Sequence, residues 1–129
     1  MDPRDLSVRM SPLVYSSLLT LVEGRLQKPV WESRKISDVV ESRLWAEYQR
    51  VVYVVLDKES RVTYVGSTIR SIAERLAEHI KIDNRINWDR VMIVPLKNGI
   101  VEAELRKFEG LIGRRLRPYD NSKLPHSSS

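Results

Sequence analysis

VVYVVLDKESRVTYVG, residues 51–66, has the pattern of a β-hairpin. Its first six residues are β-branched, aromatic or aliphatic, which is typical of a strand that is buried on both faces. The polar run at 57–60 is short enough to connect two antiparallel strands. Residues 61–65 form the returning strand, which Gly66 closes. The segment therefore predicts two neighbouring strands of a sheet.

A helix is expected directly after the hairpin. Ser71 and Glu74 have the spacing of a capping box, in which side chains satisfy backbone N–H groups at a helix start. The helix should run to about Ile80. A polar loop at 83–89, which contains Trp88, separates it from the next apolar segment.

The chain then returns to an extended pattern. Residues 90–94 predict a third strand, and Pro95 fits at its end because proline cannot donate a backbone hydrogen bond within a sheet. Asn98-Gly99 predicts a turn. A long helix should follow as far as about Arg117, where Pro118 stops it.

Two helices are expected upstream of the hairpin. Ser11-Pro12 marks the start of the first, with serine as the N-cap and proline at the first helical position. This helix should end at Gln27-Lys28-Pro29, because proline cannot continue it. Asp38 and Glu41 also have capping-box spacing and should open a second helix, which runs through Tyr48.

This order of elements predicts the fold class and the division of the chain. We expect an α+β fold with a small three-stranded, mostly antiparallel sheet flanked by helices. Residues 1–48 form a helical N-terminal extension, residues 49–123 form the central domain, and residues 124–129 form a disordered tail.

Charge is unevenly distributed along the sequence. Residues 1–48 carry seven basic and seven acidic side chains, whereas residues 49–129 carry fifteen and ten, which accounts for the whole net charge of +5. A basic domain attracts polyanions such as nucleic acid or an anionic membrane surface. The same charges also fit a solvated helix face, so charge alone leaves both interpretations open.

Composition excludes several classes of site. The chain has no cysteine, which excludes disulfides and thiolate metal sites and is typical of a cytoplasmic protein. Residues 1–10 lack the apolar run of a signal peptide, and no stretch approaches the length of a transmembrane helix. We expect a cytoplasmic or nucleoid-associated protein with no membrane partner.

Glu109 has an unusual place on the last predicted helix. At about 100° per residue it lies near an apolar stripe, formed by Leu105, Phe108, Ile112 and Leu116. A carboxylate in such a place needs a partner, a metal ion or access to water. Gly110 and Gly113 flank it inside the helix, each at a cost of about 1 kcal/mol relative to alanine. That cost indicates close packing at this point or the approach of a ligand.

Taken singly, Tyr53 and Tyr64 are most simply core aromatics. Taken together with the motifs around them, they resemble the GIY-YIG nuclease family. Val51-Val52-Tyr53 stands where the family has Gly-Ile-Tyr, and Tyr64-Val65-Gly66 stands where it has Tyr-Ile-Gly, at the family's usual interval. One departure is that Val51 replaces the glycine of the first motif, which puts the geometry near Tyr53 in question.

Two later motifs extend the resemblance over residues 49–123. Arg75 and His79 lie four residues apart on the helix after the second motif. Residues 109–121, EGLIGRRLRPYDN, resemble the late glutamate-to-asparagine segment of the bacterial excision-repair incision nucleases.

The resemblance implies a DNA endonuclease that depends on one divalent cation, Mg²⁺ or Mn²⁺, held by Glu109. Tyr53 would be the general base for the attacking water, and Tyr64 would orient the water or the phosphate. A tyrosine needs nearby positive charge or a relay for this role, because its ordinary pKa is near 10. Arg75 would stabilise the charge that develops on the phosphoryl oxygens.

The roles of the remaining candidates stay open. His79 positions Arg75, contacts the phosphate or is a structural histidine, and Asn121 braces the site by hydrogen bonds or caps the chain after Pro118. Four arginines are candidates for contacts with backbone phosphates or are simply solvated: Arg70, Arg114, Arg115 and Arg117.

Two other functions are compatible with the sequence. The chain could be a nucleic-acid-binding module that kept the fold and lost catalysis, for which Val51 is the best support. It could also be an assembly subunit. We expect residues 1–48 to mediate a homodimer or a contact with a protein partner, or to help grip DNA.

Overall fold

The computed structural model describes residues 6–83 and 87–120. Two predictions fall outside the described residues. They are the site residue Asn121 and the disordered tail at 124–129. The elements along the chain are α1 (Pro12–Leu21), β1 (Arg34–Lys35), α2 (Ile36–Ser42), β2 (Val51–Leu56), β3 (Val62–Thr68), α3 (Ile72–Asp83), β4 (Arg90–Pro95) and α4 (Glu102–Leu116).

The sheet is antiparallel throughout and has the strand order β1-β4-β2-β3. The predicted α+β class is confirmed, and the three predicted strands are all present. The sheet has one strand more than predicted, because the two-residue strand β1 pairs with β4. Strand β3 is the last in the order, so it forms one edge of the sheet.

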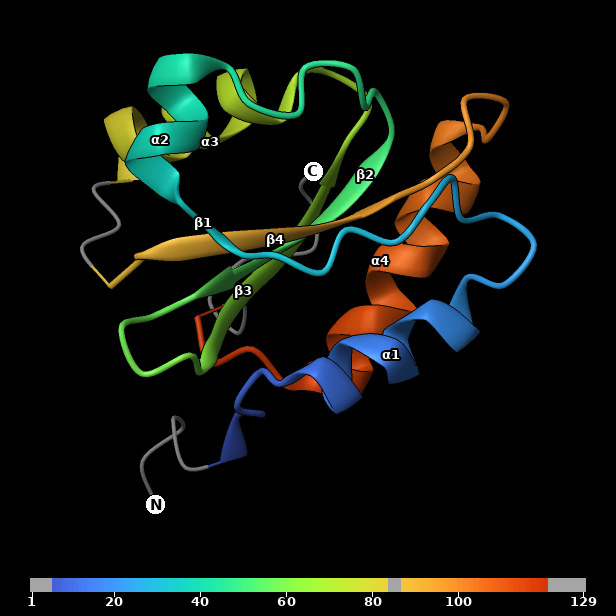
Figure 1. Cartoon of the computed structure of the whole chain (residues 1–129), viewed down its shortest axis with the longest axis horizontal. Helices are drawn as coiled ribbons and strands as arrows, with labels where there is room; N and C mark the ends of the chain where they lie inside the picture. The colour runs from blue at the N-terminus through green and yellow to red at the C-terminus, as the bar shows by residue number, and fades with distance from the viewer. Residues whose placement is uncertain (1–5, 84–86, 121–129) are drawn as a thin grey trace.

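Helices cover both faces of the sheet. Figure 1 shows α2 and α3 on one face and α1 and α4 on the other. Successive residues of β2 alternate between two cores, with Val52 and Val54 facing α4 and with Tyr53 and Val55 facing α3. All six residues of β2 are buried, as its apolar composition predicts.

Helix α1 begins as predicted and ends earlier than predicted. The Ser11 hydroxyl accepts a hydrogen bond from the backbone N–H of Val14, as an N-cap does. The helix ends at Leu21 rather than near Pro29, because the chain turns at Gly24, whose φ of 85° favours glycine. Three residues of this region lie in the core shared with α4: Tyr15, Leu18 and Val22.

Helix α2 begins at Ile36, two residues before the predicted start, so the capping box predicted at Asp38 is wrong. Asp38 lies in the first turn instead, and the helix ends at Ser42 rather than near Tyr48. The start is set by long-range contacts, because Ile36 is buried and its N–H donates to the Asp89 carbonyl beside β4. Arg43 then adopts a left-handed conformation, which stops the helix.

The other predicted boundaries are close to the observed ones. The Ser71 hydroxyl accepts from the N–H of Glu74 at the start of α3. Strand β3 continues to Thr68, so Gly66 lies within it and does not close it. The described helices include none that is long and apolar enough to cross a membrane.

Candidate active site

Tyr53 lies at the centre of the site. It is in the middle of β2 and is fully buried on the face that α3 covers. Its hydroxyl lies 3.0 Å from Nε2 of His79, within hydrogen-bonding distance. The two predicted site residues therefore interact directly. The roles expected for His79 were to position Arg75, to contact the phosphate or to be structural, and a bond to Tyr53 was not among them.

Gly66 makes room for the Tyr53 ring. It pairs with Tyr53 across β2 and β3, and a Cβ atom at Gly66 would lie 2.5 Å from the Tyr53 hydroxyl oxygen. Real Cβ atoms do not approach other atoms so closely. A glycine is therefore required at this position by the side chain that stands opposite it.

Aromatic rings enclose the Tyr53–His79 pair. Tyr64 stacks beside Tyr53 with 6.1 Å between ring centroids, and His79 meets Tyr64 edge-on at 5.2 Å. The Trp88 ring lies 5.0 Å from both His79 and Tyr64. Trp88 Nε1 donates to the Asp120 carboxylate, so the last described residue is tied to this cluster.

Arg75 lies one turn before His79 on α3 and is half-buried. Its guanidinium is near enough to Tyr53 to lower the pKa of that hydroxyl. One of its nitrogens, Nη1, donates to Glu78 at 3.0 Å. Arg75 thus stands between the buried tyrosine and the protein surface.

The surroundings of Tyr53 keep its hydroxyl protonated. Burial raises the pKa of Tyr53 above its ordinary value, Tyr64 adds to this effect, and Arg75 opposes it. The net result is a neutral phenol. Proton acceptance by Tyr53 must therefore be coupled to the loss of its own proton.

Glu109 reaches the site from the opposite face of the sheet. It lies on α4, and its Oε1 atom accepts a hydrogen bond of 2.5 Å from the Ser67 hydroxyl on β3. Burial raises the pKa of Glu109, while Ser67, Arg106 and Arg75 lower it. Strand β3 links the two faces, because its Ser67 bonds Glu109 and its Gly66 lies opposite Tyr53. Arg75 affects the pKa of both Glu109 and Tyr53.

The donor atoms at Glu109 fit a divalent cation of the magnesium type. No group of three or more His, Cys, Asp or Glu side chains within residues 6–83 and 87–120 is arranged to hold a metal ion. Magnesium needs no such group, because it is often bound through one or two carboxylates and keeps several waters. The half-buried Glu109 carboxylate, beside the Ser67 hydroxyl, supplies oxygen atoms of the required kind.

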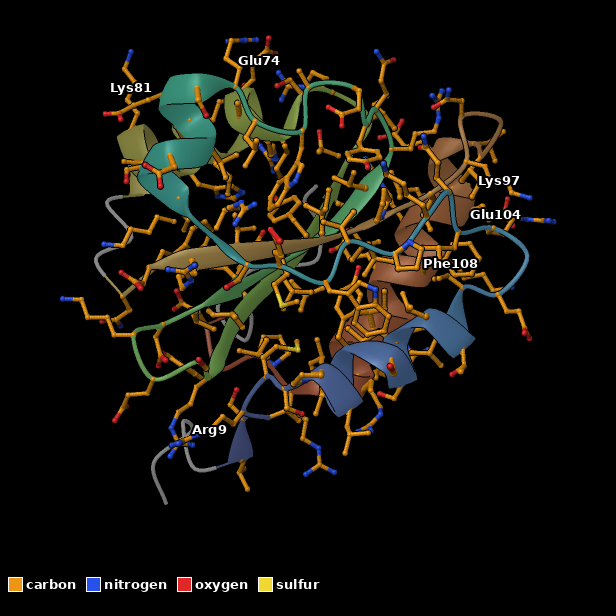
Figure 2. All side chains as sticks on the ribbon, in the orientation of Figure 1. Arg9, Glu74, Lys81, Lys97, Glu104 and Phe108 are labelled. Atoms are coloured by element: carbon orange, nitrogen blue, oxygen red, sulfur yellow. The ribbon has the colours of Figure 1, made fainter. Side chains whose placement is uncertain are left out.

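The two helical glycines near Glu109 are not there for packing. A Cβ atom at Gly113 would meet nothing within 4 Å, and one at Gly110 would meet only the Arg114 guanidinium at 3.8 Å. Tight packing against the sheet is therefore wrong as an explanation for them. The residues of α4 that face the core are Leu105, Phe108, Ile112 and Leu116. Figure 2 labels Phe108 on this helix.

The candidate phosphate-binding arginines lie at two places. Three are exposed at the end of α4 and just beyond it: Arg114, Arg115 and Arg117. Arg70 lies before α3 and forms an ion pair with Glu78. Asn121, the remaining predicted site residue, follows Asp120 and lies outside the described residues.

The structure brings together five of the predicted catalytic residues, among them Tyr64 beside Tyr53 and His79, and adds others that the sequence did not single out. Tyr53 and His79 are in contact, and Arg75 interacts with Tyr53 and Glu109. The additional residues are Ser67, which bonds Glu109, and Trp88, which covers His79. Ser67 had a signal in the sequence, since it is two residues beyond Val65 and therefore shares the face that α4 covers.

Comparison with known proteins identifies the family of the chain. Residues 49–112, about half of the 129 residues, match the family model of the GIY-YIG catalytic domain. Neither curated proteins nor solved structures give a match. The matched segment contains all the residues of the site from Tyr53 to Glu109, and through it the chain belongs to the GIY-YIG catalytic domain family, a family of nucleases.

Proposed function

We propose that this protein is a divalent-metal-dependent DNA endonuclease in which Tyr53 is the general base. One observation carries the proposal: the Tyr53 hydroxyl lies 3.0 Å from His79 Nε2, with Arg75 beside it. A buried tyrosine can accept a proton at neutral pH only if its own proton has a place to go. His79 provides that place.

The proton path follows from this geometry. The oxygen of a water molecule forms a bond to phosphorus while the water gives a proton to the Tyr53 oxygen. The phenolic proton of Tyr53 passes at the same time to His79 Nε2, which requires the tautomer with its proton on Nδ1. The bond from phosphorus to the leaving oxygen breaks, and that oxygen takes a proton from solvent.

Arg75 and Tyr64 complete the polar surroundings of the phosphate. The Arg75 guanidinium is held near Tyr53 and carries several N–H donors in a fixed plane, which suits phosphoryl oxygens that gain charge. Tyr64 packs against Tyr53 and His79, so it holds both rings in place and orients the water or the phosphate.

Glu109 would hold the cation, Mg²⁺ or Mn²⁺, with Ser67 fixing one of its oxygens. When bound, the cation supplies Lewis-acid charge at the scissile phosphate. Glu109 must be ionised for this purpose. Burial raises the pKa of Glu109 and opposes that form, whereas the Ser67 hydrogen bond and the charges of Arg106 and Arg75 favour it, as a bound cation would.

The charges favour a nucleic acid as the substrate, and DNA is the one on which GIY-YIG nuclease domains act. Arg114, Arg115 and Arg117 are exposed at the end of the helix that carries Glu109, where they can meet backbone phosphates. Binding should weaken steeply as salt is added, because each phosphate contact releases counterions. We place the protein where this substrate is, in the cytoplasm or the nucleoid.

The experiment is cleavage of supercoiled, linear and branched DNA with Mg²⁺ or Mn²⁺, comparing the wild type with Glu109→Ala. The matched control is Glu102→Ala, which removes an exposed carboxylate from the same helix. The proposal expects metal-dependent cutting by the wild type and the control, and none by Glu109→Ala. Cutting that survives in Glu109→Ala would overturn the site assignment. A folded wild type that binds DNA and cuts none would instead be a binding module.

A further inference from the structure

Glu78 lies on α3, the helix that also carries Arg75 and His79, and its carboxylate lies between two arginines. Its two carboxylate oxygens accept hydrogen bonds from Arg70 Nη1 at 2.9 Å and from Arg70 Nη2 at 3.0 Å. Oε1 also accepts from Arg75 Nη1 at 3.0 Å. Two guanidinium groups from different parts of the chain thus converge on a single carboxylate.

The three side chains are accessible from solvent. The exposed fractions are 52% for Arg70, 29% for Arg75 and 38% for Glu78. Ion pairs with this exposure contribute little to stability, because water and salt screen them. A stronger anion can therefore displace Glu78 at small cost.

Arg75 connects this cluster to the chemistry. It donates to Glu78 on one side and lowers the pKa of Tyr53 on the other. Whatever anion replaces Glu78 would therefore lie next to the proposed general base. Two arginine forks that converge on a pair of oxygens also match the non-bridging oxygens of a phosphate.

We propose that Arg70 and Arg75 form a single binding site for one phosphate of the DNA backbone, and that Glu78 occupies this site in the free protein. The inference rests on the proposed function for its ligand. DNA binding moves Glu78 out from between the arginines, and both guanidinium groups transfer to the phosphate. Arg70 and Arg75 then bind the same phosphate next to Tyr53, so Arg70 is not a separate surface contact with the DNA.

The experiment measures affinity for a DNA duplex by fluorescence anisotropy in EDTA, so that no cleavage occurs. Glu78→Gln removes the competing charge and is compared with Glu74→Gln. Glu74 lies one turn earlier on α3, carries the same charge and pairs with Arg43 instead. Figure 2 shows Glu74 on the outer side of the α2–α3 layer. Each substitution is also made in an Arg70→Ala background.

The proposal expects Glu78→Gln to bind DNA about three- to tenfold more tightly than Glu74→Gln. The advantage of Glu78→Gln should shrink when Arg70 is absent, whereas the effect of Glu74→Gln should not change. Arg70→Ala alone should weaken binding. Equal gains from the two glutamine variants, or a gain from Glu78→Gln that does not depend on Arg70, would overturn the proposal.

The failures of the two proposals differ. Wild-type protein that cuts DNA with Mg²⁺, while Glu78→Gln and Glu74→Gln bind alike, would remove this inference and leave the nuclease. Wild-type protein that binds DNA and never cuts it would remove the nuclease, and the comparison of affinities would still decide this inference. If a folded Glu78→Gln binds DNA more weakly than the wild type, Glu78 holds the arginines in place. That result would also overturn the proposal that a DNA phosphate replaces Glu78 between them.

Discussion

Gly66 stands directly opposite Tyr53 in the β2–β3 pair, and the Tyr53 ring occupies the space where a side chain at Gly66 would begin. Gly66→Ala should push this ring out of its buried position. We expect a loss of about 1–3 kcal/mol in the free energy of unfolding, as for other overpacked sites, together with loss of DNA cleavage. Urea denaturation and a cleavage assay measure the two effects. Gly99→Ala is the control, since a Cβ atom there would meet nothing within 4 Å. A stable and active Gly66→Ala would contradict the observed packing.

Removal of the Tyr53 hydroxyl should reduce DNA cleavage while the protein stays folded. Tyr53→Phe keeps the ring and loses the bond to His79, so cleavage should fall by about 10²- to 10⁴-fold, the usual contribution of a general base. Single-turnover cleavage measures this loss. Tyr15→Phe is the matched control, because Tyr15 is also buried and its hydroxyl donates to the Ile93 carbonyl rather than bonding His79. Equal activity of the two phenylalanine variants would rule out Tyr53 as the base.

Stability should fall at alkaline pH because of buried tyrosines. Burial raises the pKa of Tyr15 to about 12 from its ordinary value of 10.0. The folded state therefore holds this proton more tightly, so the stabilisation is complete below pH 10 and is lost as the pH rises through 12. The loss should not exceed about 3 kcal/mol for this group. Urea denaturation at pH 8, 10 and 11 tests the trend. Tyr15→Phe should make the fall in the free energy of unfolding with rising pH less steep. Part of the fall should remain, because the pKa of the buried Tyr53 is also raised.

Ser67 should affect metal binding through Glu109. Ser67→Ala removes the hydrogen bond that fixes Glu109 Oε1, and the concentration of Mg²⁺ or Mn²⁺ needed for half-maximal cleavage should rise about tenfold. Calorimetric titration with Mn²⁺ gives a second measurement that does not depend on activity. Ser67→Thr should restore most of the affinity. Ser17→Ala is the control, since that hydroxyl bonds only within its own helix. An unchanged Mn²⁺ affinity in Ser67→Ala would show that this bond has no part in holding the cation.

Residues 1–48 should be needed for folding. Their removal takes Tyr15, Leu18 and Val22 from one core and Ile36 and Val39 from the other. We expect the truncated chain to be unfolded by circular dichroism and to bind no DNA. A role of this segment in self-association is better tested by Leu13→Asp, because Leu13 is 83% exposed. Circular dichroism that shows a folded truncated chain would contradict the first expectation, and light scattering measures the mass of the Leu13→Asp variant.

The strands were predictable because their signals are local. Val51–Leu56 is apolar at every position, and only a strand buried on both faces suits that composition. The start of α3 was equally local, since Ser71 caps a helix that begins at the next residue. The family motifs identified Tyr53, Arg75 and Glu109 for the same reason, as each motif is short.

The features that were missed depend on contacts between distant parts of the chain. Strand β1 exists because Arg34 and Lys35 pair with β4, more than fifty residues later. The same pairing sets the start of α2 at Ile36 and overrides the caps that the sequence offers. Ser67 and Trp88 belong to the site because the fold brings Glu109 and His79 to them. No local sequence pattern predicts these contacts between distant parts of the chain.

The division of the site between the two faces of the sheet has a mechanical consequence. Tyr53 and His79 belong to one layer of the fold, Glu109 belongs to the other, and they meet around the edge strand β3. Strand β3 pairs with β2 along most of its length, and near its start it also bonds Val8, Tyr119 and Asp120. Small units of a protein open more easily than the whole. A brief separation of β3 from β2 would therefore move Ser67, and with it Glu109, relative to Tyr53 while most of the molecule stays folded. The pairing of these two strands sets the position of Glu109 relative to Tyr53.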